Sequence, residues 1–242
     1  MGISRAVILA GGNGSRLAPA TKVTNKHLLP IYDKPMIFYP LRTILKMGIT
    51  EILIICGNEH VGDFARLLGS GKDFNADFTF RIQDGARGVA DALLLAEKFS
   101  GGENLAVILG DNIFLEDFSK LSKKFSGGSQ IFLKKTNNAH RFGVAEIKNE
   151  KIISIIEKPK NPKSDLAITG IYFFDASVFD KIKSCNFSKR GELEIVDVHK
   201  KFLAEKKLSF FEIFEKWTDA GTPESFFKAS KIAREIVLSQ KN

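Results

Sequence analysis

A glycine-rich turn that ends in an arginine follows the first apolar segment of the chain. Ala6–Ala10 is an unbroken apolar run, as expected for a parallel strand buried on both faces. Gly11, Gly12 and Gly14 follow it, so the backbone can turn tightly and no side chain blocks a ligand. The N–H groups of such a turn can converge on an anion, and Arg16 adds a fixed positive charge. The pattern indicates a phosphate site, because glycine-rich linkers rarely follow a buried strand or carry an arginine.

Two common phosphate-binding motifs can be tested against this turn. The P-loop ends in Lys-Ser or Lys-Thr, and neither pair follows these glycines, so a P-loop is excluded. The dinucleotide fingerprint matches at Gly12 and Gly14, but Leu17 stands where its third glycine is required. Asp33 lies near the distance expected for a ribose-binding acid, in a Tyr-Asp-Lys-Pro turn rather than after a second strand. A nicotinamide-dependent dehydrogenase stays as an alternative.

Charged side chains also follow later apolar segments. Asp111 comes just after the apolar run Leu105–Leu109, and Asp219 precedes a helix start at Thr222-Pro223. Two carboxylates at one sheet edge suit a magnesium ion, and nearby cations suit phosphates. The candidate cations are Arg16, Lys26, Lys158 and Arg190. Taken singly, the two aspartates also fit ordinary turns, and the cations fit a solvated surface.

Strands and helices must alternate to position these groups in the first half of the chain. Strands are expected at 6–10, 52–56, 78–82 and 105–109, and helices at 35–46, 61–68 and 89–99. Such alternation predicts right-handed crossovers between parallel strands, with helices on both faces of the sheet. Ligands of open parallel sheets lie beyond the carboxyl ends of the strands, where the candidate residues follow.

The second half of the chain has closely spaced strands. They are expected at 130–134, 143–147, 152–156, 167–174 and 208–213, with helices at 195–203 and 223–237. We interpret these strands as mixed or antiparallel additions to the same sheet. Because no repeat, low-complexity tract or interdomain linker is evident, one domain is predicted over residues 1–242.

Composition excludes several classes of function. The net charge is +8, but the basic residues are scattered and do not interleave with aromatic residues, so no nucleic-acid groove is expected. The excess of positive charge would still attract polyanionic small molecules. Cys56 and Cys185 form no C-x-x-C pair, which fits a reducing compartment. With no apolar run of membrane-spanning length and no signal peptide, a cytoplasmic protein without a membrane partner is predicted. Whether copies associate as a homo-oligomer stays open.

Several segments together resemble the sugar-1-phosphate nucleotidyltransferases. They are Gly11–Leu41, Gly110-Asp111-Asn112, Phe142-Gly143-Val144, Glu157-Lys158-Pro159, Thr169-Gly170-Ile171-Tyr172, Arg190-Gly191-Glu192-Leu193-Glu194 and Asp219-Ala220-Gly221-Thr222. They occur in order over nearly the whole chain, so the likeness is far more specific than the glycine turn. Within the family the chain is most similar to the short form of the enzymes that transfer a thymidylyl group to glucose-1-phosphate. The resemblance implies an α/β, Rossmann-like three-layer αβα fold with a mixed, mostly parallel sheet and small antiparallel additions.

The resemblance also implies a role for each matching residue. The nucleotide would be bound by Leu9, Ala10, Gly11, Gly12, Gly14, Ser15, Gln83, Gly88 and Asp111, with Gln83 at the pyrimidine edge. The sugar would be bound by Gly143, Glu157 and Tyr172. The reacting phosphates would be contacted by Arg16, Lys26, Lys158 and Arg190, and magnesium would be held by Asp111 and Asp219.

The implied reaction joins dTTP to glucose-1-phosphate and releases pyrophosphate, with UTP or another sugar-1-phosphate as alternatives. No general base is needed, because a phosphate monoester has a second pKa of about 6 and is mostly dianionic at neutral pH. The site has to align two polyanions and neutralise developing charge, which magnesium and four cations can do. A non-catalytic nucleotide-sugar-binding homologue is the alternative from another class. The presence of Arg16, Asp111 and Asp219 favours an enzyme.

The chain departs from the thymidylyltransferase pattern at several points. His27 replaces the usual glutamine, Ser15 replaces the common threonine, and the segment 83–88 lacks the usual proline. Since that segment is expected beside the base, the choice between thymine and uracil stays open. The chain ends soon after the helix expected at 223–237, whereas longer members carry a further helical region. We therefore expect no allosteric site or tetramer that depends on such a region.

Overall fold

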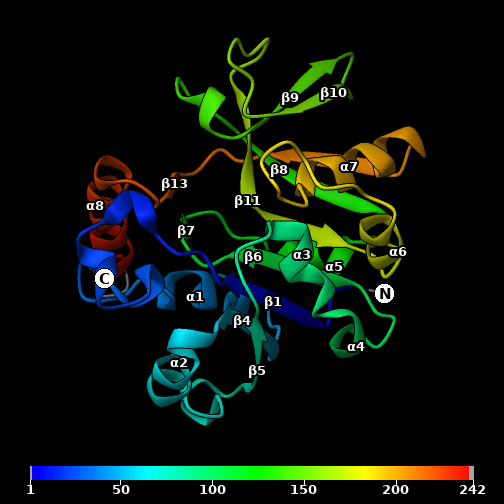
Figure 1. Cartoon of the computed structure of the whole chain (residues 1–242). Helices are drawn as coiled ribbons and strands as arrows, with labels where there is room; N and C mark the ends of the chain where they lie inside the picture. The colour runs from blue at the N-terminus through cyan, green and yellow to red at the C-terminus, as the bar shows by residue number, and fades with distance from the viewer. Residues whose placement is uncertain (1, 240–242) are drawn as a thin grey trace.

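A nine-stranded sheet forms the centre of the molecule in the computed structural model, which describes residues 2–239 (Figure 1). Its strands are β1 (Arg5–Ala10), β4 (Glu51–Gly57), β5 (Asp77–Gln83), β6 (Leu105–Leu109), β8 (Ser129–Lys135), β9 (Gly143–Lys148), β10 (Lys151–Glu157), β11 (Leu166–Phe174) and β12 (Leu208–Glu212). The main order is β10-β9-β11-β6-β1-β4-β5, and β8 pairs with β11 and with β12. Followed from pair to pair, the strand directions show that only β10 and β11 run against the other seven. The predicted mixed, mostly parallel sheet is confirmed.

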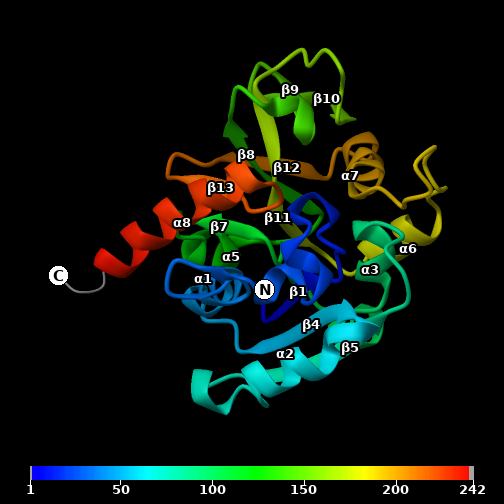
Figure 2. The ribbon, with the colours of Figure 1, turned by 60° about the vertical axis from the view of Figure 1, so that its left-hand side comes forward.

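Helices cover both faces of this sheet, which makes three layers (Figures 1 and 2). Residues of β1 alternate between two cores, as the period of a strand requires. Ala6 and Ile8 belong to the core shared with α1 (Phe38–Lys46), α2 (Val61–Leu68) and the residues around α5 (Ser119–Lys124). Val7 and Leu9 belong to the core shared with α3 (Val89–Leu94), α6 (Val178–Lys183) and α7 (Ile195–Ala204). The αβα layering predicted from the sequence is thus confirmed.

A third, smaller core supports the end of the chain. Helix α8 (Pro223–Leu238) packs there against two short hairpin-like sheets, β2 (Pro30–Ile31) with β3 (Lys34–Pro35) and β7 (Asn112–Phe114) with β13 (Trp217–Asp219). The helix begins with a capping box, in which Thr222 Oγ1 accepts a hydrogen bond from the Ser225 backbone N–H at 3.3 Å. The short 3-10 turns are Ser15–Leu17, Ala20–Lys22, Lys26–Leu28, Asn58–His60, Lys72–Phe74 and Ala139–Arg141.

Several predicted elements differ in the structure. The first helix begins at Phe38 rather than Pro35, because Pro35 pairs with Pro30 in the hairpin of β2 and β3. The helix predicted at 89–99 is two helices, α3 and α4 (Glu97–Ser100), because Ala96 N–H bonds the carbonyl three residues back and tightens the turn. Asp219 lies at the end of strand β13 and not in a turn, so that interpretation was wrong. None of the helices within residues 2–239 is long and apolar enough to span a membrane.

Candidate active site

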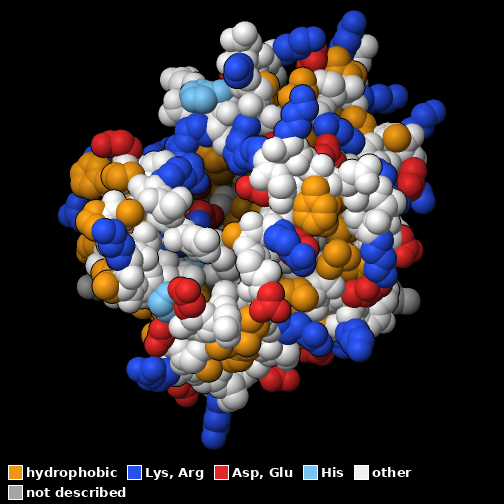
Figure 3. Space-filling model, in the orientation of Figure 1, with side chains coloured by type: hydrophobic (Ala, Val, Ile, Leu, Met, Phe, Trp, Pro, Cys, Tyr) orange, Lys and Arg blue, Asp and Glu red, His pale blue; other side chains and the backbone are white. Residues whose placement is uncertain are grey.

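Two joined hollows lie beside the carboxyl ends of β1 and β6. The first hollow has a volume of about 200 Å³ and the second about 170 Å³. Four residues line both hollows, namely Val89, Leu109, Asp111 and Glu192. Figure 3 shows the molecule hollowed near its centre, with Lys and Arg side chains around the opening. Asp111, which directly follows Gly110 after β6, therefore stands at the junction between two neighbouring binding spaces.

Most of the sequence-predicted site residues meet around these hollows. The first hollow is lined by Leu9, Gly11, Gly12, Lys26, Gln83, Gly88 and Asp111. The second is lined by Arg16, Asp111, Gly143, Glu157, Lys158, Tyr172 and Asp219. The three residues that the resemblance assigns to the sugar, Gly143, Glu157 and Tyr172, all line the second hollow, and the nucleotide residues Leu9, Gly11, Gly12, Gln83 and Gly88 line the first.

Four predicted residues do not line either hollow. Ala10 is fully buried, and its carbonyl accepts a hydrogen bond from Asn25 Nδ2 at 3.3 Å. Gly14 and Ser15 lie in the turn that leads to Arg16, where Gly14 has a φ of 62°. Arg190 is bound to carboxylates, as described below.

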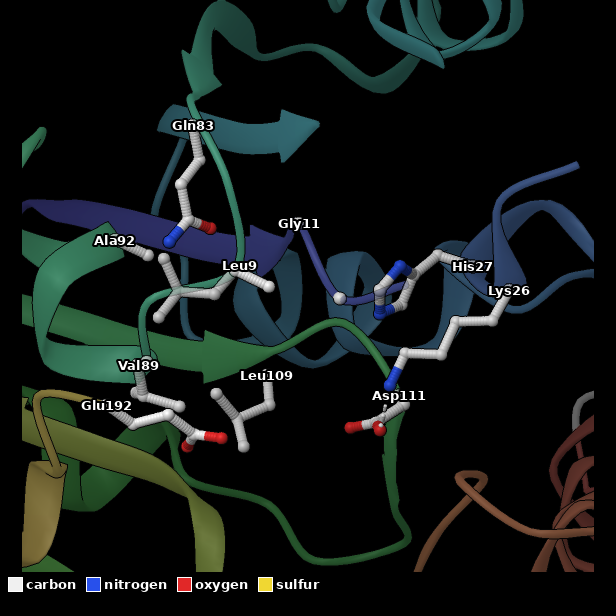
Figure 4. Close-up of a pocket in the computed structure, with 13 residues that line it drawn as sticks. Leu9, Gly11, Lys26, His27, Gln83, Val89, Ala92, Leu109, Asp111 and Glu192 are labelled. Carbon is white, nitrogen blue, oxygen red and sulfur yellow. Dashed lines mark hydrogen bonds and ion pairs between the residues drawn. The ribbon is translucent and has the colours of Figure 1, made fainter. Parts of the chain in front are cut away.

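The glycine turn is open toward the first hollow. Within residues 2–239, the backbone N–H groups of Gly12 and Asn13 donate to no protein acceptor, so both are free to bind a ligand. At Gly11 a Cβ atom would collide with Gln83 Oε1, so any larger residue there would displace the Gln83 amide from its present position. Figure 4 shows Gln83 and Lys26 on opposite sides of this space.

Asp111 forms a buried ion pair with Lys26. Lys26 Nζ lies 2.5 Å from Asp111 Oδ2 (Figure 4). Asn112 Nδ2 donates to Asp111 Oδ1 at 2.8 Å. Burial opposes ionisation of Asp111, but Lys26, His27 and the hydrogen bonds outweigh it and hold the pKa of that carboxyl below its usual range. Asp111 is therefore ionised at neutral pH.

The buried His27 ring lies near this ion pair and lines the same hollow (Figure 4). Burial, with the Lys26 charge beside it, lowers the pKa of His27 to about 3, so the ring is neutral at physiological pH. Its Nδ1 lies 2.7 Å from Asn25 Oδ1, which also accepts the His27 backbone N–H. The ring thus adds no charge beside Lys26.

Asp219 forms a second ion pair next to the first. Arg141 Nη2 donates to Asp219 Oδ2 at 2.9 Å, and Ala220 N–H donates to the Asp111 carbonyl at 2.8 Å. Burial first, and then the charge of Asp111, raise the pKa of Asp219, so the two carboxylates lie close enough to repel each other. Lys26 thus balances Asp111, while Arg141 pairs with Asp219 and the nearby charge of Arg16 also acts on that carboxylate.

The donor set around these carboxylates fits one kind of metal ion. No group of three or more His, Cys, Asp or Glu side chains in the described part of the chain could hold a metal on its own. Magnesium, however, is commonly held by one or two carboxylates while waters and substrate phosphates complete its coordination. Asp111 and Asp219 provide such a pair of carboxylates beside a space open to a ligand.

Asn112 holds three strands in place next to Asp111. Its Oδ1 accepts hydrogen bonds from Gly170 N–H of β11 at 3.0 Å and from Trp217 Nε1 of β13 at 2.7 Å. A Cβ atom at Gly170 would come within 2.5 Å of the Asn112 side chain, so β11 must carry a glycine there. Because Asn112 also donates to Asp111, the network fixes one carboxylate relative to the strand that bears the other.

Two cations lie beside Glu157, which lines the second hollow. Glu157 Oε1 lies 3.2 Å from Lys158 Nζ and 3.3 Å from Arg190 Nη2. Arg190 also binds Glu194 Oε1 at 2.8 Å, so its charge is largely engaged by carboxylates. Tyr172 lies within β11 rather than at its end, and burial followed by the charge of Glu157 raises the pKa of its hydroxyl.

Comparisons with known proteins show the family to which the chain belongs. The model of the nucleotidyl transferase family matches residues 5–235. The chain belongs to that family. This nucleotidyltransferase is 40% identical over 240 residues to a glucose-1-phosphate thymidylyltransferase of Neisseria meningitidis, with 96% of this chain and 83% of the relative covered. It is 38% identical to the protein of that name from Mycobacterium tuberculosis, with 98% and 84% covered. A dehydrogenase is thereby excluded.

Solved structures share the fold of this nucleotidyltransferase. A Bacillus anthracis protein provisionally named a glucose-1-phosphate thymidylyltransferase, crystallised with sucrose, superposes with a TM-score of 0.92 at 48% identity, covering 96% of this chain and 95% of that one. A UDP-glucose pyrophosphorylase with bound UDP-glucose superposes with a TM-score of 0.84 at 23% identity, covering 96% and 99%. The second likeness concerns the fold alone.

Sequence reasoning assigned no site role to several residues that shape the site of this nucleotidyltransferase. They are Asn25, His27, Arg141, Glu192 and Trp217. Arg141 directly precedes the segment Phe142-Gly143-Val144 that was recognised, so its position carried a usable signal. Asn25 gives no comparable signal, because its role depends on hydrogen bonds to the histidine two residues later and to Ala10.

Proposed function

We propose that this nucleotidyltransferase transfers a thymidylyl group from dTTP to glucose-1-phosphate and releases pyrophosphate. The observation that carries the proposal is the position of Asp111 at the junction of two hollows, one for each substrate. The choice of substrates is supported by the names of relatives that are 37–40% identical over nearly the whole chain.

The first hollow suits a nucleoside triphosphate. Gln83 is buried and polar, so its amide can pair with the edge of a pyrimidine, while Leu9 and Gly88 give a narrow apolar surface for the ring. The free N–H groups of Gly12 and Asn13 lie where phosphate oxygens can approach the turn. Lys26, whose side chain lies beside Gly12, adds positive charge to this phosphate site (Figure 4).

The second hollow suits a sugar-1-phosphate. Glu157 can accept hydrogen bonds from two sugar hydroxyls, and Gly143 lines the same hollow without a side chain. Lys158 and Arg190 lie beside Glu157, and Arg16 lies at the same hollow near Asp219. These cations would bind the sugar phosphate and the triphosphate. Arg190 can do so only by leaving some of its carboxylate partners.

A magnesium ion, which we propose is held by Asp111 and Asp219, supplies positive charge to the phosphates when it is bound. The residues of the chain bring the two phosphates together. An oxygen of the sugar phosphate forms a bond to the α-phosphorus of dTTP, and the bond from that phosphorus to the bridging β-phosphate oxygen breaks. Arg16 and Lys26 stabilise the charge that pyrophosphate gains as it leaves. No proton has to be removed from the attacking group, which is already anionic.

A matrix of nucleotides against sugar-1-phosphates tests the proposal. The purified protein is incubated with magnesium and each pair drawn from dTTP, UTP and other nucleoside triphosphates with several sugar-1-phosphates, and pyrophosphate is assayed. The highest rate is expected with dTTP and glucose-1-phosphate. A higher rate with UTP would correct the nucleotide, and no release with any pair would refute an enzyme in favour of a nucleotide-sugar-binding protein.

A further inference from the structure

The two carboxylates of the site are both engaged by cations of the chain itself. Lys26 binds Asp111 Oδ2, and Arg141 binds Asp219 Oδ2. All four side chains are largely shielded from solvent, so these pairs are strong compared with ordinary surface pairs. A divalent cation that uses both carboxylates has to compete with both pairs.

Arg141 cannot respond to this competition by losing its charge. A guanidinium does not lose its proton in proteins, so Arg141 stays charged and cannot remain close to a metal ion. The Arg141 guanidinium carbon also lies 5.3 Å from the centroid of the Phe142 ring. This contact does not require Arg141 to stay at Asp219. When a metal ion binds Asp219, Arg141 therefore needs another anion as its partner.

The second hollow offers that anion once substrate is bound. Arg141 lines this hollow together with Arg16, Lys158 and both aspartates. Phosphate oxygens that enter the hollow would meet a planar fork of donors, which binds phosphate better than it binds water. Arg141 comes from the turn Ala139–Arg141 before β9, so its side chain can move without any change in the central sheet.

We propose that Arg141 is an exchangeable counter-ion: it neutralises Asp219 in the free protein and moves to a substrate phosphate when a divalent cation takes the carboxylate. In the free protein, Arg141 thus offsets the negative charge of Asp219. The Arg141 guanidinium leaves this carboxylate only when substrate phosphates and a divalent cation are bound. The proposal rests on the proposed function, because it requires a metal ion and phosphates at this site.

Titration with Mn²⁺ in the absence of substrates tests the first half of the exchange. Arg141→Gln removes the competitor, so it should bind Mn²⁺ about fivefold more tightly than the unaltered protein, as measured by calorimetry or electron paramagnetic resonance. Arg66→Gln, which alters an exposed pair with Asp63, serves as the matched control and should leave the affinity unchanged. Weaker or equal Mn²⁺ binding by Arg141→Gln would overturn the proposal, since a merely structural arginine would weaken the site.

Turnover tests the second half. Arg141→Gln should lower kcat by about a hundredfold, because a phosphate contact is lost, and Arg141→Lys should recover part of that loss. An unchanged kcat in Arg141→Gln would overturn the exchange.

If neither protein binds Mn²⁺ without substrates, a crystal structure with Mn²⁺ and dTDP-glucose decides. Arg141 on a phosphate supports the exchange, and Arg141 still bound to Asp219 refutes it. The Mn²⁺ titration needs no turnover, so failure of the proposed function is seen separately, as absent pyrophosphate release by the unaltered protein.

Discussion

At the scale of single residues, the site is organised by paired charges. Asp111 and Asp219 repel each other, and the cations that balance them come from two distant segments of the chain. The result is a buried cluster that is close to neutral, although it is built to receive a cation and several phosphates. Replacing either carboxylate by its amide changes this charge while almost preserving the shape.

Asp111→Asn and Asp219→Asn should each lower kcat by about a hundredfold or more, because each removes charge from the proposed metal site. The fold should survive, since an amide oxygen can still accept a hydrogen bond from Lys26 or Arg141. Pyrophosphate release and near-ultraviolet circular dichroism measure the two effects. Asp73→Asn, an exposed aspartate of a surface turn, is the matched control. Near-normal rates in both variants would contradict a shared metal site.

The sequence indicated these two carboxylates and Lys26, which pairs with Asp111, but it did not indicate Arg141 or Asn25. Asp111 and Asp219 could be found because each follows or precedes a recognisable element and belongs to a recognisable segment. Arg141 and Asn25 act through contacts across 78 and 15 positions of the chain, and of the two only Arg141, next to the recognised segment Phe142-Gly143-Val144, has a local signal. The roles assigned to the site residues, Arg190 included, stay predictions.

At the scale of elements, very short strands connect the site to the fold. β7 and β13 have three residues each, too few for the alternation of apolar and polar residues to be visible in the sequence. The long buried strands β1, β4 and β6 were predicted correctly, because their apolar runs are continuous. The short strands β7 and β13 are held by hydrogen bonds of the Asn112 side chain and not by a long apolar run that the sequence would reveal.

Asn112→Leu should destabilise the protein by about 2–4 kcal/mol, because it leaves Gly170 N–H and Trp217 Nε1 buried without an acceptor. Activity should fall as well, since Asp111 loses a hydrogen bond that orients it. Urea unfolding followed by circular dichroism measures the loss. Asn161→Leu in an exposed loop is the control, with a change expected within about 0.5 kcal/mol. Equal stability of the two variants would show that the three strands do not depend on this amide.

At the scale of the whole molecule, a buried histidine makes stability depend on pH. His199 of α7 is fully buried, stacks on Phe174 with ring centroids 5.2 Å apart, and accepts or donates one hydrogen bond with Ser129. Burial lowers its pKa from 6.5 to about 3, and its Nε2 has no hydrogen-bond partner in the described structure. The folded protein therefore binds fewer protons than the unfolded chain in the acidic range.

Stability should consequently fall as the pH drops below the unfolded pKa of His199, and the loss continues down toward its folded pKa. Between about pH 7 and about pH 5, His199 alone should account for a loss of about 2 kcal/mol. His199→Gln should remove this share of the pH dependence, as measured by urea unfolding at both pH values. The exposed His140→Gln should keep the full dependence. An identical slope in His199→Gln and the unaltered protein would contradict a neutral buried ring.

The residues that line the two hollows come from different parts of the chain, and this affects how mutations can change substrate specificity. Apart from the four shared residues, the lining of the first hollow comes entirely from positions before 93. Apart from the shared residues and Arg16, the lining of the second hollow comes from positions after Asp111. β9 and β10, which project from the rest of the molecule in both views, join the sheet at a single registered pair, Ala167 with Val144 (Figures 1 and 2). Under the proposed function, mutations in this late arm can thus alter the accepted sugar while the strands that recognise the base keep their sequence, so the two specificities can evolve separately.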